Sequence, residues 1–126
     1  MGFGRIGRNL FRILYRSEDI EVAAISDPAD PKALEYLLRY DTLHGRFPDE
    51  VSIREKNLYV VGRQIPLLEA RDPGDVPWGA FGVDIVIEAT ARHRTRAQLE
   101  QGLERGAGRM ILCAPPVDPP DITAVM

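Results

Sequence analysis

A glycine-rich loop at the start of the chain constrains its fold more than any other stretch. Residues 2–7 read Gly-Phe-Gly-Arg-Ile-Gly, the pattern G-x-G-x-x-G, and lead directly into an apolar-periodic segment at 8–16. In such a loop the first glycine makes a tight turn, the second lets the backbone approach a pyrophosphate, and the third allows close helix packing. The helix that follows presents free N–H groups and its positive dipole end to the anion. The loop therefore predicts a dinucleotide-binding α/β unit.

A carboxylate at the expected distance from the loop strengthens this interpretation. Asp27 follows Gly7 by about 20 residues and stands just after the apolar run Val22–Ile25, which we predict to be a strand buried on both faces. At the tip of such a strand a carboxylate accepts hydrogen bonds from an adenosine ribose.

The two ends of the sequence suggest that segments of the fold are missing. The fingerprint normally follows the central β-strand of a doubly wound sheet, yet only Met1 precedes Gly2, and the chain stops inside another apolar stretch at 121–126. We expect an internal piece of a longer protein that lacks its first strand. Because a lost central strand removes buried side chains and hydrogen-bond partners, we also expect the isolated piece to be unfolded or prone to aggregation.

Composition excludes several classes of function. The 126 residues (14.1 kDa) suffice for one domain with a hydrophobic core, and 44% hydrophobic with 28% charged residues is typical of a soluble globular protein. A net charge of −3 and a pI of about 5.4 give no basic field for nucleic acid or an anionic membrane. The single cysteine rules out an internal disulfide, and no apolar run approaches the roughly 20 residues that span a bilayer.

The order of apolar patterns predicts an α/β fold. Helical periodicity predicts helices at Arg8–Arg16, at Pro31–Tyr40 and from the cap Thr95 through Leu103. Continuous apolar runs predict buried strands at Val22–Ile25, Val83–Glu88 and Arg109–Cys113. Period-two alternation predicts antiparallel strands at Val51–Arg54, Leu58–Val61 and Gln64–Leu67, between the second helix and the second buried strand. We place the hairpin turns at Lys56-Asn57 and Gly62-Arg63. Residues 1–126 thus form one Rossmann-type domain, with a doubly wound, mostly parallel sheet and a small antiparallel insertion at about 51–68.

Several motifs resemble those of one enzyme family along essentially the whole chain. They are the loop at 2–8, Ser26-Asp27-Pro28, the octet Tyr40-Asp41-Thr42-Leu43-His44-Gly45-Arg46-Phe47, Arg71-Asp72-Pro73, Pro77-Trp78-Gly79, Val86-Ile87-Glu88-Ala89-Thr90 and Cys113-Ala114-Pro115. Together they resemble the cofactor domain of the glyceraldehyde-3-phosphate dehydrogenases, and the octet is the most specific of them. The sister family of erythrose-4-phosphate dehydrogenases is similar nearly as closely.

The resemblance implies a cytoplasmic, homotetrameric enzyme of glycolysis. Such an enzyme oxidises an aldehyde phosphate through a thioester on a cysteine, passes hydride to NAD and releases the acyl group to inorganic phosphate. In the family the reactive cysteine, its histidine partner and the substrate-phosphate sites lie C-terminal to where this chain ends. The catalytic domain is therefore absent here, and we expect no catalytic residue in the chain. A non-catalytic dinucleotide-binding module is the alternative from a different class.

The resemblance also assigns cofactor contacts by position. The backbone of the loop would meet the pyrophosphate, Asp27 would hold the ribose and favour NAD by repelling a 2′-phosphate, and Arg71 would sit at the adenine pocket. A three-residue wall and a residue near the nicotinamide end complete the set of NAD contacts: Gly4, Arg5, Ile6, Gly7, Asp27, Arg71, Ala89, Thr90, Ala91 and Cys113.

Two departures from the family pattern fall in the wall. The family usually has Ser-Thr-Gly followed by an aromatic residue two positions on, whereas this chain has Ala89-Thr90-Ala91 and then His93. If the glycine position requires a positive φ, Ala91 alters the wall, and His93 changes the packing near the adenine. We interpret Cys113 as a packed thiol rather than a nucleophile and His44 as a structural hydrogen-bonding residue, and no Cys/His cluster has metal-ligand spacing.

Overall fold

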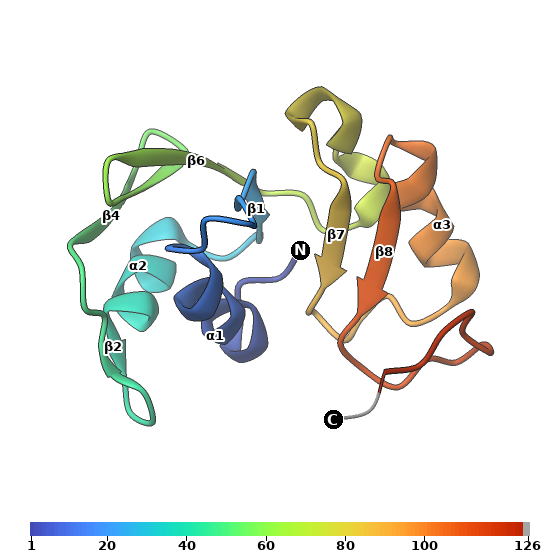
Figure 1. The fold of residues 1–126 in the computed structure, drawn as a ribbon, viewed down its shortest axis with the longest axis horizontal. Helices are drawn as coiled ribbons and strands as arrows, with labels where there is room; N and C mark the ends of the chain where they lie inside the picture. Colours follow the sequence, from blue (N-terminus) through green and yellow to red (C-terminus); the bar gives the residue numbers. More distant parts are fainter. Residues whose placement is uncertain (125–126) are drawn as a thin grey trace.

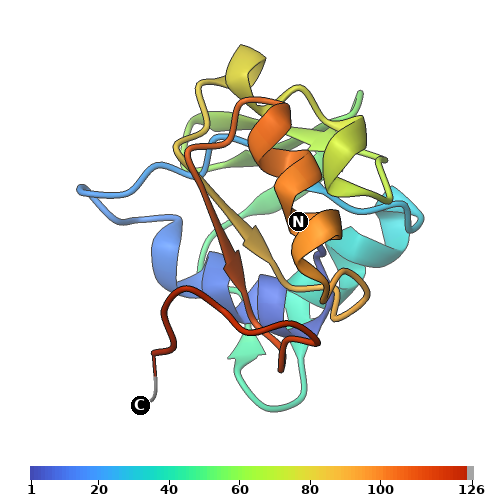
Figure 2. The ribbon, with the colours of Figure 1, turned by 90° about the vertical axis from the view of Figure 1, so that its right-hand side faces the viewer.

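The computed structural model describes residues 1–124, and its elements lie on either side of the N-terminus (Figure 1). One half holds helices α1 (Arg5–Leu14) and α2 (Pro31–Arg39) and a four-stranded sheet. The other half holds a parallel pair of strands covered by helix α3 (Arg96–Glu104), which lies nearest the viewer in Figure 2. Among residues 1–124, no helix is long and apolar enough to cross a membrane.

The four-stranded sheet is mixed. Its order is β1 (Ile25–Ser26), β6 (Arg63–Leu68), β5 (Asn57–Val60) and β4 (Val51–Arg54). Strand β6 pairs in parallel with β1, with Ile25 opposite Leu67, and antiparallel with β5. Strand β6 therefore connects the antiparallel strands β4 and β5 to the parallel strand β1.

The second half is built around β7 (Ile85–Glu88) and β8 (Arg109–Leu112), which pair in parallel. Two short 3-10 helices, η1 (Pro73–Asp75) and η2 (Trp78–Phe81), lead into β7. Helix α3 begins with a complete capping box, because the Thr95 hydroxyl accepts from the Gln98 amide while the Gln98 side chain accepts from the Thr95 amide. A buried cluster of Val76, Trp78, Val86 and Ala107 holds this half together.

The first half has its own apolar core, centred on aromatic rings. Phe11 packs edge-on against Phe3 and stacks on Tyr15 and Phe47, at ring-centroid distances of 5.6, 5.6 and 6.1 Å. Strand side chains such as Leu58, which is fully buried, complete the core from the sheet side. Helix α1 is therefore fixed to the sheet by its apolar face, while its N-terminal turn remains accessible.

The α/β Rossmann-type fold is confirmed, with differences in several elements. Helix α1 spans Arg5–Leu14, whereas the helix was predicted at Arg8–Arg16. The predicted strand Val22–Ile25 is ordered as a strand only at Ile25–Ser26, and the parallel strands form two pairs because β1 and β7 do not pair directly. The two-residue hairpin loops are Glu55-Lys56 and Val61-Gly62, one position earlier than predicted. The end of the predicted helix at Tyr40 instead begins a short hairpin, β2 (Tyr40–Asp41) with β3 (Gly45–Arg46).

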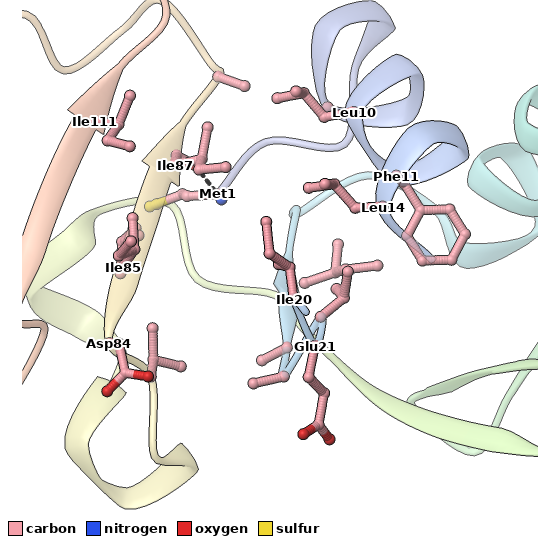
Figure 3. A pocket seen from close by; sticks show the side chains of 18 of the residues that line it. Met1, Leu10, Phe11, Leu14, Ile20, Glu21, Asp84, Ile85, Ile87 and Ile111 are labelled. Atoms are coloured by element: carbon pink, nitrogen blue, oxygen red, sulfur yellow. Dashed lines mark hydrogen bonds between the residues drawn. The ribbon is translucent and has the colours of Figure 1, made fainter. Parts of the chain in front are cut away.

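An apolar cavity of about 630 Å³ separates the two halves (Figure 3). We call it the strand slot. Ile85 and Ile87 of β7 line one side, while Leu10 and Leu14 of α1 and the segment 19–25 line the other. The predicted strand at 22–25 is short because its backbone faces this slot, where the described chain offers it no hydrogen-bonding neighbour.

Among residues 1–124, the first two bridge the slot by backbone hydrogen bonds, and they do so as a strand would. The Met1 amine donates to the Ile87 carbonyl at 2.6 Å, and the Met1 carbonyl accepts from the Ala89 amide at 2.8 Å. On the opposite side the Gly2 amide donates to the Ser26 carbonyl at 2.8 Å. The alternation of these bonds along β7 is that of a parallel ladder, so residues 1–2 align β1 with β7.

Candidate functional site

The predicted cofactor residues gather at one edge of the molecule, where the parallel strands end. Asp27 follows β1, Arg71 follows β6, Ala89 follows β7 and Cys113 follows β8. Because β1, β6, β7 and β8 run in the same direction and are aligned through Met1 and Gly2, their carboxyl ends share this edge. Open α/β sheets bind ligands outside the carboxyl ends of their strands, at the point where the strand order reverses.

The glycine loop presents unpaired amides at this edge. The Arg8 amide is the first of α1 to be bonded within the helix, to the Gly4 carbonyl at 2.9 Å, and the amides of Arg5, Ile6 and Gly7 meet no acceptor among residues 1–124. A Cβ on Gly4 would meet nothing within 4 Å, so the space in front of the loop is open. A Cβ on Gly7 would lie 2.0 Å from the Gly2 carbonyl oxygen, which shows why the helix can pack here only with glycine.

Asp27 is held facing the loop. Its Oδ2 accepts from the Phe3 amide at 2.8 Å, and its Oδ1 accepts from the Ala29 amide at 2.8 Å. Its own amide donates to the Leu68 carbonyl at 2.8 Å, which fixes the backbone between β1 and β6. Since each carboxylate oxygen has two lone pairs, both oxygens retain the capacity to accept from a ribose hydroxyl.

Arg71 and Cys113 occupy opposite parts of the edge. Arg71 is exposed on the loop after β6, and this loop is tied to β1 by the Ser26 hydroxyl, which donates to the Ala70 carbonyl at 3.0 Å. Cys113 is half-buried, its amide donates to the Glu88 carbonyl at 3.0 Å, and burial raises the pKa of its thiol. A thiol with a raised pKa is a poor nucleophile, which agrees with the interpretation of Cys113 as a packing residue.

The turn after β7 forms the wall of the site. Ala91 has φ +60°, so the position where the family usually has glycine does require the left-handed region. The Thr90 amide donates to Glu88 Oε1 at 2.7 Å, and the Arg92 amide donates to the Thr90 hydroxyl at 3.0 Å. A Cβ on Gly2 would lie 2.7 Å from Thr90 Cγ2, so this wall presses directly on the glycine loop.

Two carboxylates that sequence reasoning did not single out lie under this wall. His93 is buried with its Nδ1 3.1 Å from Glu88 Oε2 and its Nε2 2.8 Å from Asp72 Oδ1. Glu88 itself is fully buried. The only signal in the sequence was a glutamate that ends an otherwise apolar strand, since a buried carboxylate requires partners. His44, by contrast, lies exposed in the β2–β3 turn, where its amide and Nδ1 contact Asp41 Oδ1.

The same turn explains a lowered pKa at Asp41. Its Oδ1 accepts from the amides of His44 and Leu43, at 2.9 and 2.7 Å. These bonds lower the pKa of Asp41 to about 2. His44 thus helps to stabilise the turn within the octet, as its interpretation as a structural hydrogen-bonding residue predicted.

Comparison with known proteins bears directly on this arrangement. The family model described as "Glyceraldehyde 3-phosphate dehydrogenase, NAD binding domain" matches residues 1–96. The chain is 47% identical over 125 residues to a glyceraldehyde-3-phosphate dehydrogenase of Geobacillus stearothermophilus, 46% over 126 residues to one of Streptomyces coelicolor and 45% over 127 residues to one of Thermotoga maritima. In each case 99% of this chain aligns, and it covers 37–38% of the relative's length.

The match of the family model extends from the glycine loop through β7 to the first residue of α3, and so includes most of the edge described above. The cofactor of such a domain is NAD. The chain therefore belongs to the glyceraldehyde-3-phosphate dehydrogenase family and corresponds to its NAD-binding domain.

Proposed function

We propose that residues 1–126 bind NAD along the edge formed by the glycine loop, Asp27, Arg71, the wall Ala89–Ala91 and Cys113. The amides of Arg5, Ile6 and Gly7 donate to the pyrophosphate, and the dipole of α1 favours its negative charge. Asp27 accepts from the ribose hydroxyls, and Arg71 lies at the adenine. Cys113 is placed toward the nicotinamide end. Bound NAD supplies a hydride acceptor, and the residues named here bind and orient it.

One observation carries this proposal: the same backbone segment presents both recognition elements. Phe3, inside the glycine loop, donates its amide to Asp27 Oδ2 at 2.8 Å, and the three unpaired amides follow within the next four residues. A ligand with an anionic group next to a hydroxylated sugar can bind the unpaired amides and the Asp27 carboxylate at the same time. A carboxylate at this position repels a 2′-phosphate, so NAD is preferred to NADP.

We further propose that the protein to which this domain belongs oxidises glyceraldehyde 3-phosphate. The chemistry is that of a cysteine thioester formed outside these residues, in a cytoplasmic homotetramer. An alternative substrate is erythrose 4-phosphate. Comparing NAD reduction with the two aldehydes, in a protein that carries this domain joined to its catalytic half, distinguishes them.

A non-catalytic dinucleotide-binding module is the second candidate, and two residues favour it. Ala91 and His93 replace the glycine and the aromatic residue that the family usually has in the wall. A protein that binds NAD but reduces it with neither aldehyde would support this alternative.

Asp27 provides the direct test of the cofactor site. We expect Asp27→Ala to raise the dissociation constant of NAD by about ten- to a hundredfold, because a hydrogen bond to a charged group contributes about 1.5–3 kcal/mol. The variant should also narrow the preference for NAD over NADP. Isothermal titration calorimetry with each dinucleotide measures both effects.

Asp19→Ala is a suitable control, because Asp19 is an exposed aspartate outside this edge. This variant should leave the dissociation constants of NAD and NADP unchanged. Equal NAD affinity in the Asp27→Ala variant and the unmodified protein would remove Asp27 from the ribose site.

A further inference from the structure

His93 lies between two carboxylates and contacts both. Its side chain is 7% exposed, and its two ring nitrogens lie 3.1 Å from Glu88 Oε2 and 2.8 Å from Asp72 Oδ1. A neutral imidazole has one N–H and can donate to only one of them, whereas an imidazolium donates to both. Both ring nitrogens thus lie within hydrogen-bond distance of a carboxylate, one on a fully buried glutamate from β7 and one on an aspartate, 58% exposed, from the loop before η1.

Glu88 connects this histidine to the wall of the cofactor site. While Oε2 faces His93, Oε1 accepts from the Thr90 amide at 2.7 Å and from the Thr90 hydroxyl. The Thr90 hydroxyl also lies 3.4 Å from His93 Nδ1. A carboxylate buried this deeply is tolerated only when it is paired and hydrogen-bonded, so Glu88 needs partners, and His93 and Thr90 are the partners that contact it.

The wall needs such support because its backbone is strained. Ala91 has φ +60°, a conformation that residues with a side chain rarely adopt and that persists only when neighbouring contacts fix it. Thr90 also sits where a Cβ on Gly2 would collide, so a shift of the turn would move it against the glycine loop. The hydrogen bonds of Glu88 oppose this shift, together with the bond from the Arg92 amide to the Thr90 hydroxyl.

The second carboxylate extends the connection across the site. Asp72 is adjacent in sequence to Arg71, which we place at the adenine, and belongs to the loop after β6. His93 therefore joins the turn after β7 to the loop after β6, two segments that line the proposed NAD groove from different strands.

We propose that His93, as an imidazolium, is a positioning residue for NAD. By donating to Glu88 and Asp72 it fixes the Thr90 turn and the Arg71 loop relative to each other, and so sets the shape of the adenosine half of the groove. This proposal rests on the proposed function of the same edge. It also assigns a role to the histidine that departs from the family's aromatic residue.

Two measurements test it in a protein that carries residues 1–126 joined to the catalytic half. Nitrogen-15 NMR of the histidine side chains at neutral pH should show both ring nitrogens of His93 protonated. Calorimetry should show NAD binding weakened by about tenfold in His93→Ala and also in Asp72→Ala, since groups in one hydrogen-bonded network couple by amounts of this order. In the double variant, the dissociation constant of NAD should rise by less than the product of the two single fold-changes.

Two further variants separate positioning from general destabilisation. His44→Ala removes the other histidine, which lies exposed in the β2–β3 turn, and should leave the NAD affinity unchanged. His93→Gln keeps an amide donor for one carboxylate and should recover part of the affinity lost in His93→Ala. Thermal unfolding of each variant shows whether its affinity and stability change in parallel.

The outcomes that would overturn the proposal differ from those that would overturn the proposed function. A neutral ring in the NMR spectrum of the folded protein would refute the imidazolium bridge. NAD affinities that are equal in the unmodified chain, Asp72→Ala and His93→Gln would refute the positioning role alone. A chain with a doubly protonated His93 that does not bind NAD would refute the proposed function, and the positioning role with it.

Discussion

Ala91 places a side chain where the backbone favours glycine. Its φ of +60° lies in the left-handed region, which costs a residue with a Cβ roughly 1–2 kcal/mol. The residue is exposed, so its methyl group contributes little packing in return. The wall of the proposed cofactor site therefore stores strain that a single substitution can relieve.

We expect Ala91→Gly to stabilise the chain. Relief of the strain is partly offset by the greater freedom of glycine in the unfolded state, about 0.4–1 kcal/mol, which leaves a net gain of about 0.5–1 kcal/mol. For a chain of this length that gain corresponds to a rise of about 2–5 °C in the midpoint of thermal unfolding, followed by circular dichroism.

Ala97→Gly makes the same chemical change at an exposed position inside helix α3. There glycine should lower the free energy of unfolding by about 0.5–1 kcal/mol. If both variants were destabilised to a similar extent, Ala91 would not be strained.

Individual residues of the site differ in how far the sequence could specify them. The positions of Gly7 and Asp27 follow from spacing alone, because the close approach at Gly7 and the carboxylate of Asp27 belong to one local unit. The bridge from Glu88 through His93 to Asp72 could not be predicted. Its members come from separate segments, and their contact depends on a turn conformation that no local pattern encodes.

At the scale of elements, one hairpin carries a β-branched residue in a position that disfavours it. The β5–β6 loop consists of Val61 and Gly62, with φ values of +48° and +71°. Positive φ at both central residues is typical of a type I′ turn, for which Asn-Gly is strongly preferred. Val61 is 54% exposed, so its side chain gains little burial to compensate.

We expect Val61→Asn to raise the free energy of unfolding by about 1 kcal/mol, because asparagine tolerates the left-handed region and valine does not. Chemical denaturation followed by circular dichroism gives the change directly. Val117→Asn is the matched control, since this exposed valine is not among the residues with positive φ. The control should stay within about 0.5 kcal/mol of the unmodified chain, and an equal response in the two variants would contradict the explanation.

The elements show where pattern and tertiary context separate. Periodicity located α2, the antiparallel strands and β7–β8 closely, because each buries a face that its own sequence marks. It misplaced both hairpin turns by one residue, since the alternation of side chains does not reveal which residues have positive φ. It also predicted a full strand at 22–25, where the apolar pattern is present but a neighbour for the backbone is not.

At the scale of the whole molecule, the strand slot separates two otherwise independent cores. The cavity of about 630 Å³ is lined mainly by apolar side chains from both halves, and Met1 lies at its end with the hydrogen bonds of a parallel strand. A peptide that continued backwards from Met1 would run between the segment 22–25 and β7 (Figure 3). It would offer hydrogen bonds to both edges and join the two strand pairs into one sheet.

The slot also buries a charge. Burial lowers the pKa of the Met1 ammonium below its ordinary value of 8.0. Because the unfolded chain then binds the proton more tightly than the folded one, stability is fully present above pH 8 and is lost as the pH falls through the lowered pKa. An extension would turn this amine into a peptide amide and remove that dependence.

We therefore expect the extension Val-Ile-Val-Ala-Val, placed directly before Met1, to stabilise the chain by about 3 kcal/mol. Burying each aliphatic side chain contributes about 1.5–3 kcal/mol, ordering each residue costs about 1–2 kcal/mol, and the new backbone hydrogen bonds add to the difference. Thermal unfolding at several pH values should show a midpoint raised by about 10 °C and less loss of stability just below pH 8. The matched extension Val-Pro-Val-Pro-Val cannot donate at its prolines and should give the loss of the pH dependence without the gain in stability. Equal stabilisation by both extensions would mean that the slot does not accept a strand.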